Sequence, residues 1–267
     1  MLIAQISDTH LRAAGDPMQG YIDTARALAD CIAHVNGLRP QPDVAIVTGD
    51  LTDRGTPEDY ALLRQMLDDL AMPYYVIPGN HDDRDRLRST FSDLGYLPTN
   101  GEFLQYAVES WPLRLIGLDT VFPGECSGGL CAVRREWLAA RLAEQPQRPT
   151  ILFMHHPPFP SGIGFLDRPA FDGADQVRSL IASHPQIRQI ACGHIHRAIH
   201  VNWAGTCAAI APSTVYQMNL AFEPGSGFEL TSDPPAITLY RWSDGVGPVG
   251  YISLIKASPQ IDRAGTG

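Results

Sequence analysis

The sequence has no excess of positive charge. Its 267 residues include 20 Lys and Arg against 29 Asp and Glu, so the net charge is −9. Proteins that bind polynucleotides without sequence specificity need a basic surface. We therefore expect no polynucleotide partner, and any phosphate chemistry must take its positive charge from a local source.

Membrane segments and a disulfide framework are also missing. No apolar run approaches the ~18 residues of a membrane span, and the first seven residues have the character of a β-strand rather than of a signal peptide. The five cysteines are odd in number and irregularly spaced, which favours reduced thiols. Whether Cys126 and Cys131 pair across a Gly-rich loop stays open. These absences predict a cytoplasmic protein that makes no membrane contact.

The sequence does contain short apolar strands that alternate with helical stripes, which is typical of an α/β fold. The residues of one stripe recur every three or four positions and predict a core-facing helix: Tyr21, Ala25, Leu28, Ile32 and Val35. The strands are expected within residues 1–7, 44–48, 74–77, 113–118, 150–154 and 190–192.

The strand at 44–48 organises the chemistry of the chain. Gly49 follows it and gives a turn that leaves Asp50 at the carboxyl end of the strand. Open α/β sheets bind their ligands at that end. On its own a Gly-Asp pair after a strand also fits a simple loop. Whether Asp50 belongs to a functional site therefore depends on the residues at the other strand ends.

Those other strands also end in residues that bind metals. Asp8 and His10 follow the first strand, and their spacing places both side chains on one side of an extended chain. The same spacing applies to His194 and His196. Each motif alone also fits a polar loop or a β-turn. The remaining candidates at strand ends are Asn80, His81 and His155.

Neighbouring polar residues are expected to support the site or the fold. Adjacent side chains of an extended chain point to opposite sides, so we choose His155 over His156 as a ligand. Asp119 is expected to be structural, and Asp82 and Asp83 are expected to cap the following helix. Carboxylate, imidazole and amide ligands together favour Mn, Fe, Zn or Co over Mg or Ca, and we expect two such ions.

Taken together, the motifs resemble those of the calcineurin-like metallophosphoesterases. They cover residues 8 to 196 and look closest to the bacterial branch of class III cyclic nucleotide phosphodiesterases and glycerophosphodiesterases. The resemblance implies a four-layer α-β-β-α sandwich with two mixed sheets and a metal site at the carboxyl ends of the strands. The motifs are Asp8-x-His10, Gly49-Asp50, Gly79-Asn80-His81-Asp82, His155 and Gly193-His194-x-His196.

The resemblance also implies a role for each residue. One metal would be held by Asp8, His10, Asp50 and His196, and the other by Asp50, Asn80, His155 and His194. His81 would stay free of metal and assist the reaction as the catalytic residue, and Asn80 would also meet the substrate. The implied reaction is attack of a metal-bound hydroxide on a small phosphodiester, either a cyclic nucleotide or a glycerophosphodiester.

Arg54 leaves an alternative reaction open. An arginine at this position also fits the Ser/Thr protein phosphatases, where it binds the phosphate of a monoester, so Arg54 is a candidate substrate-binding residue. The alternatives to a phosphodiesterase are therefore a phosphomonoesterase of the same fold and a scaffold that has lost the chemistry.

The C-terminal part contains β-type segments without a titratable cluster. We expect residues 1–200 to form the catalytic domain and residues 201–267 to add strands that complete the second sheet. The runs 235–242 and 249–254 predict a hairpin, and residues 218–228 are expected to cap the site or to make an oligomer contact. Homo-oligomer formation through the hairpin is the predicted assembly.

Overall fold

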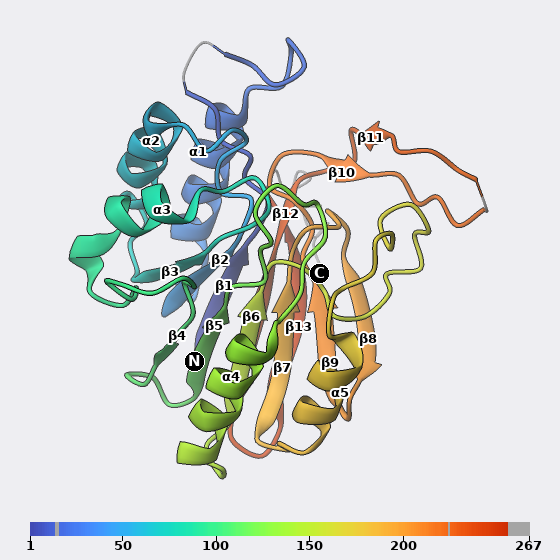
Figure 1. Ribbon diagram of the computed structural model, residues 1–267. Helices are drawn as coiled ribbons and strands as arrows, with labels where there is room; N and C mark the ends of the chain where they lie inside the picture. The colour runs from blue at the N-terminus through green and yellow to red at the C-terminus, as the bar shows by residue number, and fades with distance from the viewer. Residues whose placement is uncertain (14–15, 224, 256–267) are drawn as a thin grey trace, which may run out of the picture.

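The computed structural model describes residues 1–13, 16–223 and 225–255, and two mixed β-sheets form its centre (Figure 1). The first sheet has the strand order β13-β12-β1-β2-β3. Strands β1, β2 and β3 are parallel, whereas β12 is antiparallel to both of its neighbours. The bounds are β1 Leu2–Ile6, β2 Val44–Thr48, β3 Tyr74–Ile77, β12 Ala236–Ser243 and β13 Gly247–Leu254.

The second sheet has the order β4-β5-β6-β7-β9-β8. Its four central strands are parallel, and β4 and β8 are antiparallel edge strands. Strands β5 and β6 are buried along their whole length, and parallel strands covered on both faces need the mostly apolar sequence that both have. The bounds are β4 Tyr106–Val108, β5 Arg114–Leu118, β6 Thr150–Met154, β7 Ile187–Cys192, β8 Ile199–Trp203 and β9 Thr206–Ile210.

Helices cover the outer face of each sheet, as Figure 1 shows. One core cluster joins the first sheet to α1 (Thr24–Gly37), α2 (Pro57–Leu67) and α3 (Arg84–Thr90), and it includes Ile151 and Phe153 of the second sheet. A second cluster packs α4 (Ala132–Glu144) and α5 (Ala174–Ala182) on the other side. The four-layer α-β-β-α arrangement is therefore confirmed. The remaining elements are the short helix Ser92–Leu94 and the ribbon of β10 (Gln217–Met218) and β11 (Leu230–Thr231).

The helical stripe predicted from residue 21 begins three residues later than expected. Asp23 caps α1 by accepting a hydrogen bond from the Arg26 amide, and Tyr21 lies outside the helix with 73% of its surface exposed. The side-chain oxygen of Asp23 satisfies an amide that would otherwise lack a partner, which fixes the start of the helix there.

The C-terminal strands divide between the two sheets, so the expectation that they all complete the second sheet is wrong. Strands β8 and β9 do join the second sheet, but the hairpin β12–β13 pairs with β1 in the first. The pattern of apolar residues predicts the hairpin but carries no information on which sheet edge it meets. That edge is the side of β1 opposite β2, where the β1 backbone needs hydrogen-bond partners.

Within the part of the chain that the structure describes, no helix is both long and apolar enough to cross a membrane. Cys126 and Cys131 are free thiols, so the loop between them is not closed by a disulfide.

Candidate metal centre

The predicted ligands lie in tight turns at the strand ends rather than in extended chain. Seven non-glycine residues of the described segments have positive φ, and five of them are predicted ligands: Asp8, His10, Asp50, His194 and His196. A left-handed backbone costs free energy for residues with a side chain, and such strain concentrates at functional sites. The extended backbone that was expected at Asp8, His10, His194 and His196 is therefore wrong, because these residues are left-handed.

One cluster joins the ends of β1 and β7. The Nε2 atoms of His10 and His196 are 3.1 Å apart, and the His196 Nε2 lies 3.3 Å from Asp8 Oδ1. The His194 amide donates to the Asp8 carboxylate, which fixes that side chain. Asp8, His10 and His196 are all buried. Three donors from two distant parts of the chain thus converge on one point.

A second cluster joins the ends of β2, β3 and β6. The His155 Nε2 lies 3.1 Å from Asn80 Oδ1 and 3.4 Å from Asp50 Oδ1. The other Asp50 oxygen, Oδ2, lies 3.6 Å from the His10 Nε2 of the first cluster. The His194 ring is centred 5.1 Å from that of His155. The carboxylate of Asp50 therefore lies between the two clusters, with one oxygen toward each.

The Nδ1 contacts of His155 and His196 indicate whether the clusters are suited to bind a metal ion. The Nδ1 of His155 is 2.8 Å from the Thr48 carbonyl oxygen, and that of His196 is 3.1 Å from the Tyr216 carbonyl oxygen. A carbonyl only accepts, so each Nδ1 carries a proton and each Nε2 points toward the centre. A neutral imidazole there would place its Nε2 lone pair against carboxylate and amide oxygens, so the centre needs a cation, which is either a proton on Nε2 or a metal ion. Such outer contacts of ligand histidines are typical of metal sites, and the residues fit bound metal.

The charges of the site agree with this fit. Burial opposes ionisation of Asp8 and Asp50, but the imidazoles of His196 and His155 outweigh it and hold the pKa of each carboxyl below its usual value. Burial lowers the pKa of His10, and it lowers that of His194 to about 3 with the help of His155. Burial opposes protonation of His155 too, yet Asp50 and Asp8 raise its pKa to about 9. Two buried carboxylates therefore need positive charge at the centre.

His81 lies beside the clusters without joining their centre. Its Nδ1 is 2.8 Å from the Asp53 carbonyl oxygen, and its side chain is 39% exposed. Burial lowers the pKa of His81, but Asp50 and the Asp53 carbonyl outweigh it, so the pKa lies above its usual value. Since Nδ1 donates to that carbonyl, Nε2 is the atom free to exchange a proton with a ligand.

Arg54 is held away from the clusters by acidic neighbours. Its guanidinium contacts Asp16 and forms an ion pair with Asp59 at 2.9 Å. It lines a surface hollow that also includes Asn80 and His81. The structure thus places Arg54 near the site with its donors already engaged.

Asp82 does not cap the following helix, as was expected, but has a different structural role. Only Asp83 caps α3, by accepting from the Arg86 amide. The partly buried carboxylate of Asp82 accepts hydrogen bonds from the amides of Leu51, Thr52 and Gly79, and from the hydroxyl of Tyr60. Asp82 therefore ties the turn after β3 to the turn after β2. A helix cap predicted from sequence pairs a side chain only with amides a few residues away. The contacts of Asp82 with the distant residues Leu51 and Thr52 were therefore not predicted.

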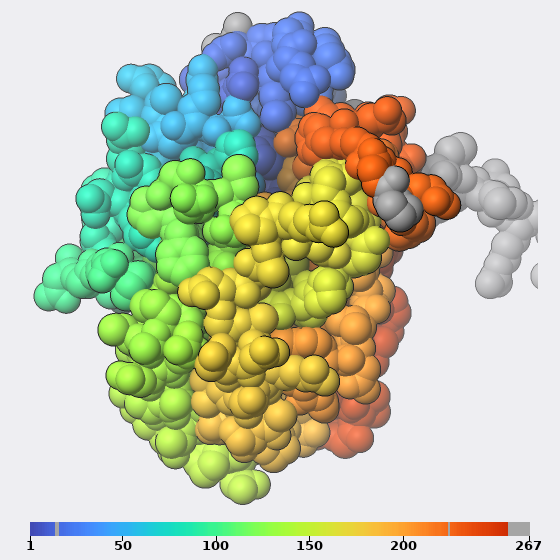
Figure 2. Space-filling view, turned by 45° about the vertical axis from the view of Figure 1, so that its right-hand side comes forward, coloured from blue at the N-terminus to red at the C-terminus, as the bar shows by residue number. Residues whose placement is uncertain are grey.

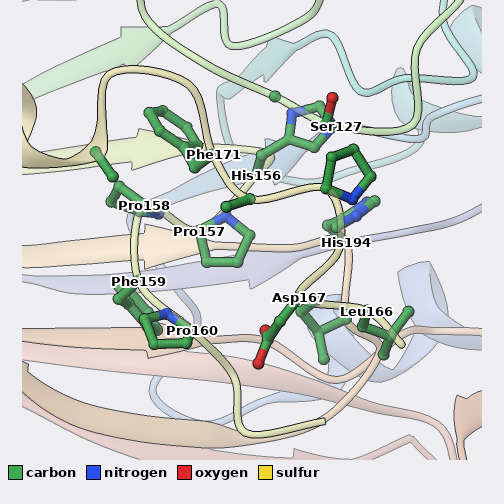
Figure 3. A pocket seen from close by; sticks show the side chains of 15 residues that line it. Ser127, His156, Pro157, Pro158, Phe159, Pro160, Leu166, Asp167, Phe171 and His194 are labelled. Carbon is green, nitrogen blue, oxygen red and sulfur yellow. The ribbon is translucent and has the colours of Figure 1, made fainter. Parts of the chain in front are cut away.

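Asp119 and His156 support the fold around the site. Asp119 is buried and pairs with Arg84 at 2.7 Å. The Nδ1 of His156 is 2.8 Å from the Thr120 hydroxyl, and its ring is 4.7 Å from that of His194. His156 lines a mainly apolar pocket of about 210 Å³ between the loop after β6 and His194, shown in Figure 3. Burial and His155 hold its pKa well below the usual value, so it is neutral.

Two neighbours of the clusters escaped the sequence patterns. The Asp53 Oδ1 lies 3.3 Å from the His10 Nδ1, and the ring of Tyr216 lies 4.7 Å from that of His196. Asp53 belongs to the same turn as Asp50. That closeness in sequence was the one feature from which its place beside the clusters could have been predicted. Nothing in the residues around Tyr216 marks it, since its contacts are made by chain that is distant in sequence.

A family comparison covers most of the chain. The profile described as "Calcineurin-like phosphoesterase" matches residues 1–198. The chain belongs to the calcineurin-like phosphoesterase family. This confirms the family proposed from the five motifs, and together with relatives named as phosphodiesterases it confirms the expectation of a hydrolase.

Several calcineurin-like phosphoesterases resemble the chain over nearly its full length. A probable glycerophosphodiester phosphodiesterase GpdQ from Arcobacter nitrofigilis is 35% identical over 96% of this chain and 93% of its own length. The 3',5'-cyclic adenosine monophosphate phosphodiesterase CpdA of Escherichia coli K12 is 30% identical, over 99% of this chain and 94% of its own. Among solved structures, a dimetal phosphatase from Danio rerio has a TM-score of 0.65 at 16% identity, covering 96% of this chain and 99% of its own. That structure supports the fold alone.

Proposed function

We propose that this phosphoesterase is a binuclear metal-dependent phosphodiesterase that hydrolyses small diesters. The observation that carries the proposal is the place of Asp50, whose two carboxylate oxygens face the two clusters at 3.4 and 3.6 Å. A carboxylate between two groups of imidazole lone pairs is suited to bridge a pair of cations.

The two ligand sets are those that the family resemblance implies, and the proximity of these residues supports them. Asp8, His10, Asp50 and His196 would hold one ion, and Asp50, Asn80, His155 and His194 the other. Fe, Mn, Zn and Co suit this mixed set of donors. Two such ions supply a water nucleophile that is active at neutral pH and positive charge for the phosphoryl oxygens.

His81 would act as the acid of the reaction. Its Nδ1 is engaged with the Asp53 carbonyl, which orients the ring, and its raised pKa favours a proton on Nε2. That proton would pass to the leaving oxygen, which otherwise departs as an alkoxide. Asn80 would position the phosphoryl group beside it.

Two observations favour diesters over monoesters. Relatives that align over almost the whole chain are named phosphodiesterases, for glycerophosphodiesters and for cyclic nucleotides. Arg54, which suits the second negative charge of a monoester, is already paired with Asp16 and Asp59. We still include Arg54 as a substrate contact at the rim of the site.

The decisive experiment compares bis(p-nitrophenyl) phosphate with p-nitrophenyl phosphate after reconstitution with Mn, Fe, Zn or Co. We expect a higher kcat/KM for the diester. A strong preference for the monoester would make the protein a phosphomonoesterase. A screen of cyclic nucleotides and glycerophosphodiesters then follows with the best metal.

We also propose a cytoplasmic homo-oligomer that contacts through the C-terminal hairpin. Strand β13 is an edge strand that exposes several apolar side chains, and such an edge favours pairing with another chain. Light scattering of the purified protein tests this, and a monomer at high concentration would exclude it. The exposed side chains are Val249, Tyr251, Ile252 and Leu254.

A further inference from the structure

A cleft of about 300 Å³ lies over the metal centre, and its two sides differ in chemistry. One side is lined by Asp50, Asn80, His81 and three of the cluster histidines, which are His10, His194 and His196. The opposite side comes from two segments that are distant in sequence, the loop after β6 and the segment around β10 and β11. Figure 2 shows these segments next to each other on one face of the molecule. The second side is lined by Phe165, Leu166, Arg168, Met218 and Phe228.

Two phenylalanines join these segments. The rings of Phe165 and Phe228 are in edge-to-face contact, with centroids 5.8 Å apart. Phe228 is nevertheless 52% exposed, so a large part of its ring is free to contact a ligand. Aromatic rings favour stacked or edge-on contact with other aromatic rings. This wall of the cleft therefore suits a planar ring better than a chain of hydroxyl groups.

Arg168 supplies the positive charge of the same wall. Three other arginines near the site pair with acids: Arg12 with Asp53, Arg54 with Asp59, and Arg197 with Asp233. Arg168 is exposed, and across the described segments no ion pair or hydrogen bond engages its guanidinium. A guanidinium offers five N–H donors and no acceptor. Its natural partner in the cleft is a group rich in acceptors, whereas a cationic group is repelled.

We propose that Arg168, Phe165 and Phe228 select the organic group of the substrate. The cleft takes diesters whose organic group is an aromatic ring with hydrogen-bond acceptors, as in a nucleotide, and disfavours those with a cationic amine head group. The ring packs on the two phenylalanines and its acceptors meet Arg168. The inference rests on the proposed phosphodiesterase function and chooses between its two substrate classes.

The first test measures kcat/KM for 3′,5′-cyclic AMP and for glycerophosphoethanolamine with the metal-loaded protein. Arg168→Gln should lower the value for cyclic AMP about 10-fold, the effect of one charged hydrogen bond, and leave that for glycerophosphoethanolamine unchanged or higher. Phe165→Leu keeps the apolar bulk but removes the ring, and should act in the same direction. Arg188→Gln, an exposed arginine of β7, is the matched control and should change neither value.

A second measurement separates this inference from the proposed function. Calorimetric titration with 5′-AMP and with glycerol 3-phosphate needs no turnover, and Arg168→Gln should weaken only the binding of AMP. If AMP binding depends on Arg168 while no diester is hydrolysed, the proposed function alone fails. Equal effects of Arg168→Gln on both ligands, or a wild-type preference for glycerophosphoethanolamine, would overturn the inference.

Discussion

The residues proposed as ligands combine strained backbone with buried charge. Asp8, His10, Asp50, His194 and His196 have φ between 40° and 73°, and each such residue costs about 1–3 kcal/mol. The hydrogen bonds around them offset this cost. The Asp8 carboxylate accepts from the His194 amide, and the Asp50 carboxylate from the His81 amide. The turns are thus held by the same side chains that form the centre.

Loss of Asp50 is expected to affect both metal ions. Asp50→Ala removes the carboxylate between the clusters, so metal content measured by mass spectrometry should fall from about two equivalents to below one. Asn80→Ala removes a donor of one cluster only and should leave about one equivalent bound. Equal losses in the two variants, or none in Asp50→Ala, would contradict the bridging role.

The effect of removing His81 should depend on the leaving group. His81→Ala removes the proton donor, so kcat for an alkyl ester should drop about 10²–10³-fold. p-Nitrophenolate leaves without a proton, and its diester should lose much less. His200→Ala, on the exposed face of β8, serves as the control. The same loss for both esters would show that His81 does not donate the proton.

At the scale of elements, close packing of the strand-end turns brings the clusters together. The turn after β3 lies directly on Asp50, and a Cβ added at Gly79 would be 2.2 Å from both the Asp50 amide nitrogen and Oδ1. A Cβ at Gly193 would be 2.3 Å from the Ser7 hydroxyl oxygen. These turns accept only glycine, because a side chain would push the ligand-bearing strands apart.

Gly79→Ala is therefore expected to damage both the stability and the site. Overpacking of this kind typically costs about 1–3 kcal/mol, and displacement of Asp50 should reduce bound metal. Urea unfolding and metal analysis measure the two effects. Gly37→Ala at the end of α1 is the matched control, since no atom lies within 4 Å of its added Cβ. Wild-type stability and metal content in Gly79→Ala would refute the packing argument.

At the scale of the whole molecule, a buried network ties the C-terminal hairpin to both sheets. The Tyr240 hydroxyl of β12 donates to Gln5 Oε1 of β1 at 2.9 Å. The Gln5 amide nitrogen donates in turn to the Thr48 hydroxyl of β2 and to the Cys192 carbonyl of β7. The hairpin is thus an integral part of the core beneath the metal centre.

Removal of the Tyr240 hydroxyl should lower stability without changing the chemistry. Tyr240→Phe leaves a buried acceptor on Gln5 without its donor, which costs about 1–3 kcal/mol. The free energy of unfolding in urea should fall by that amount, while kcat of the metal-loaded enzyme stays at its wild-type value. Tyr251→Phe, at an exposed position of β13, should change neither. A kcat loss in Tyr240→Phe would place the network in the active site instead.

The sequence by itself determined which residues bring metal-binding chemistry and which strands carry them. Donor type and position after an apolar run are local properties, so Asp8, Asp50, Asn80, His155 and His196 could be predicted as ligands without coordinates. Tertiary structure alone decided which donors meet, which sheet takes the hairpin, and that acidic residues engage Arg54. Those outcomes depend on contacts between segments far apart in the chain. Arg54 and Arg168 differ only in the residues that lie near them in space. The sequence around an arginine does not show which distant residues will lie beside it.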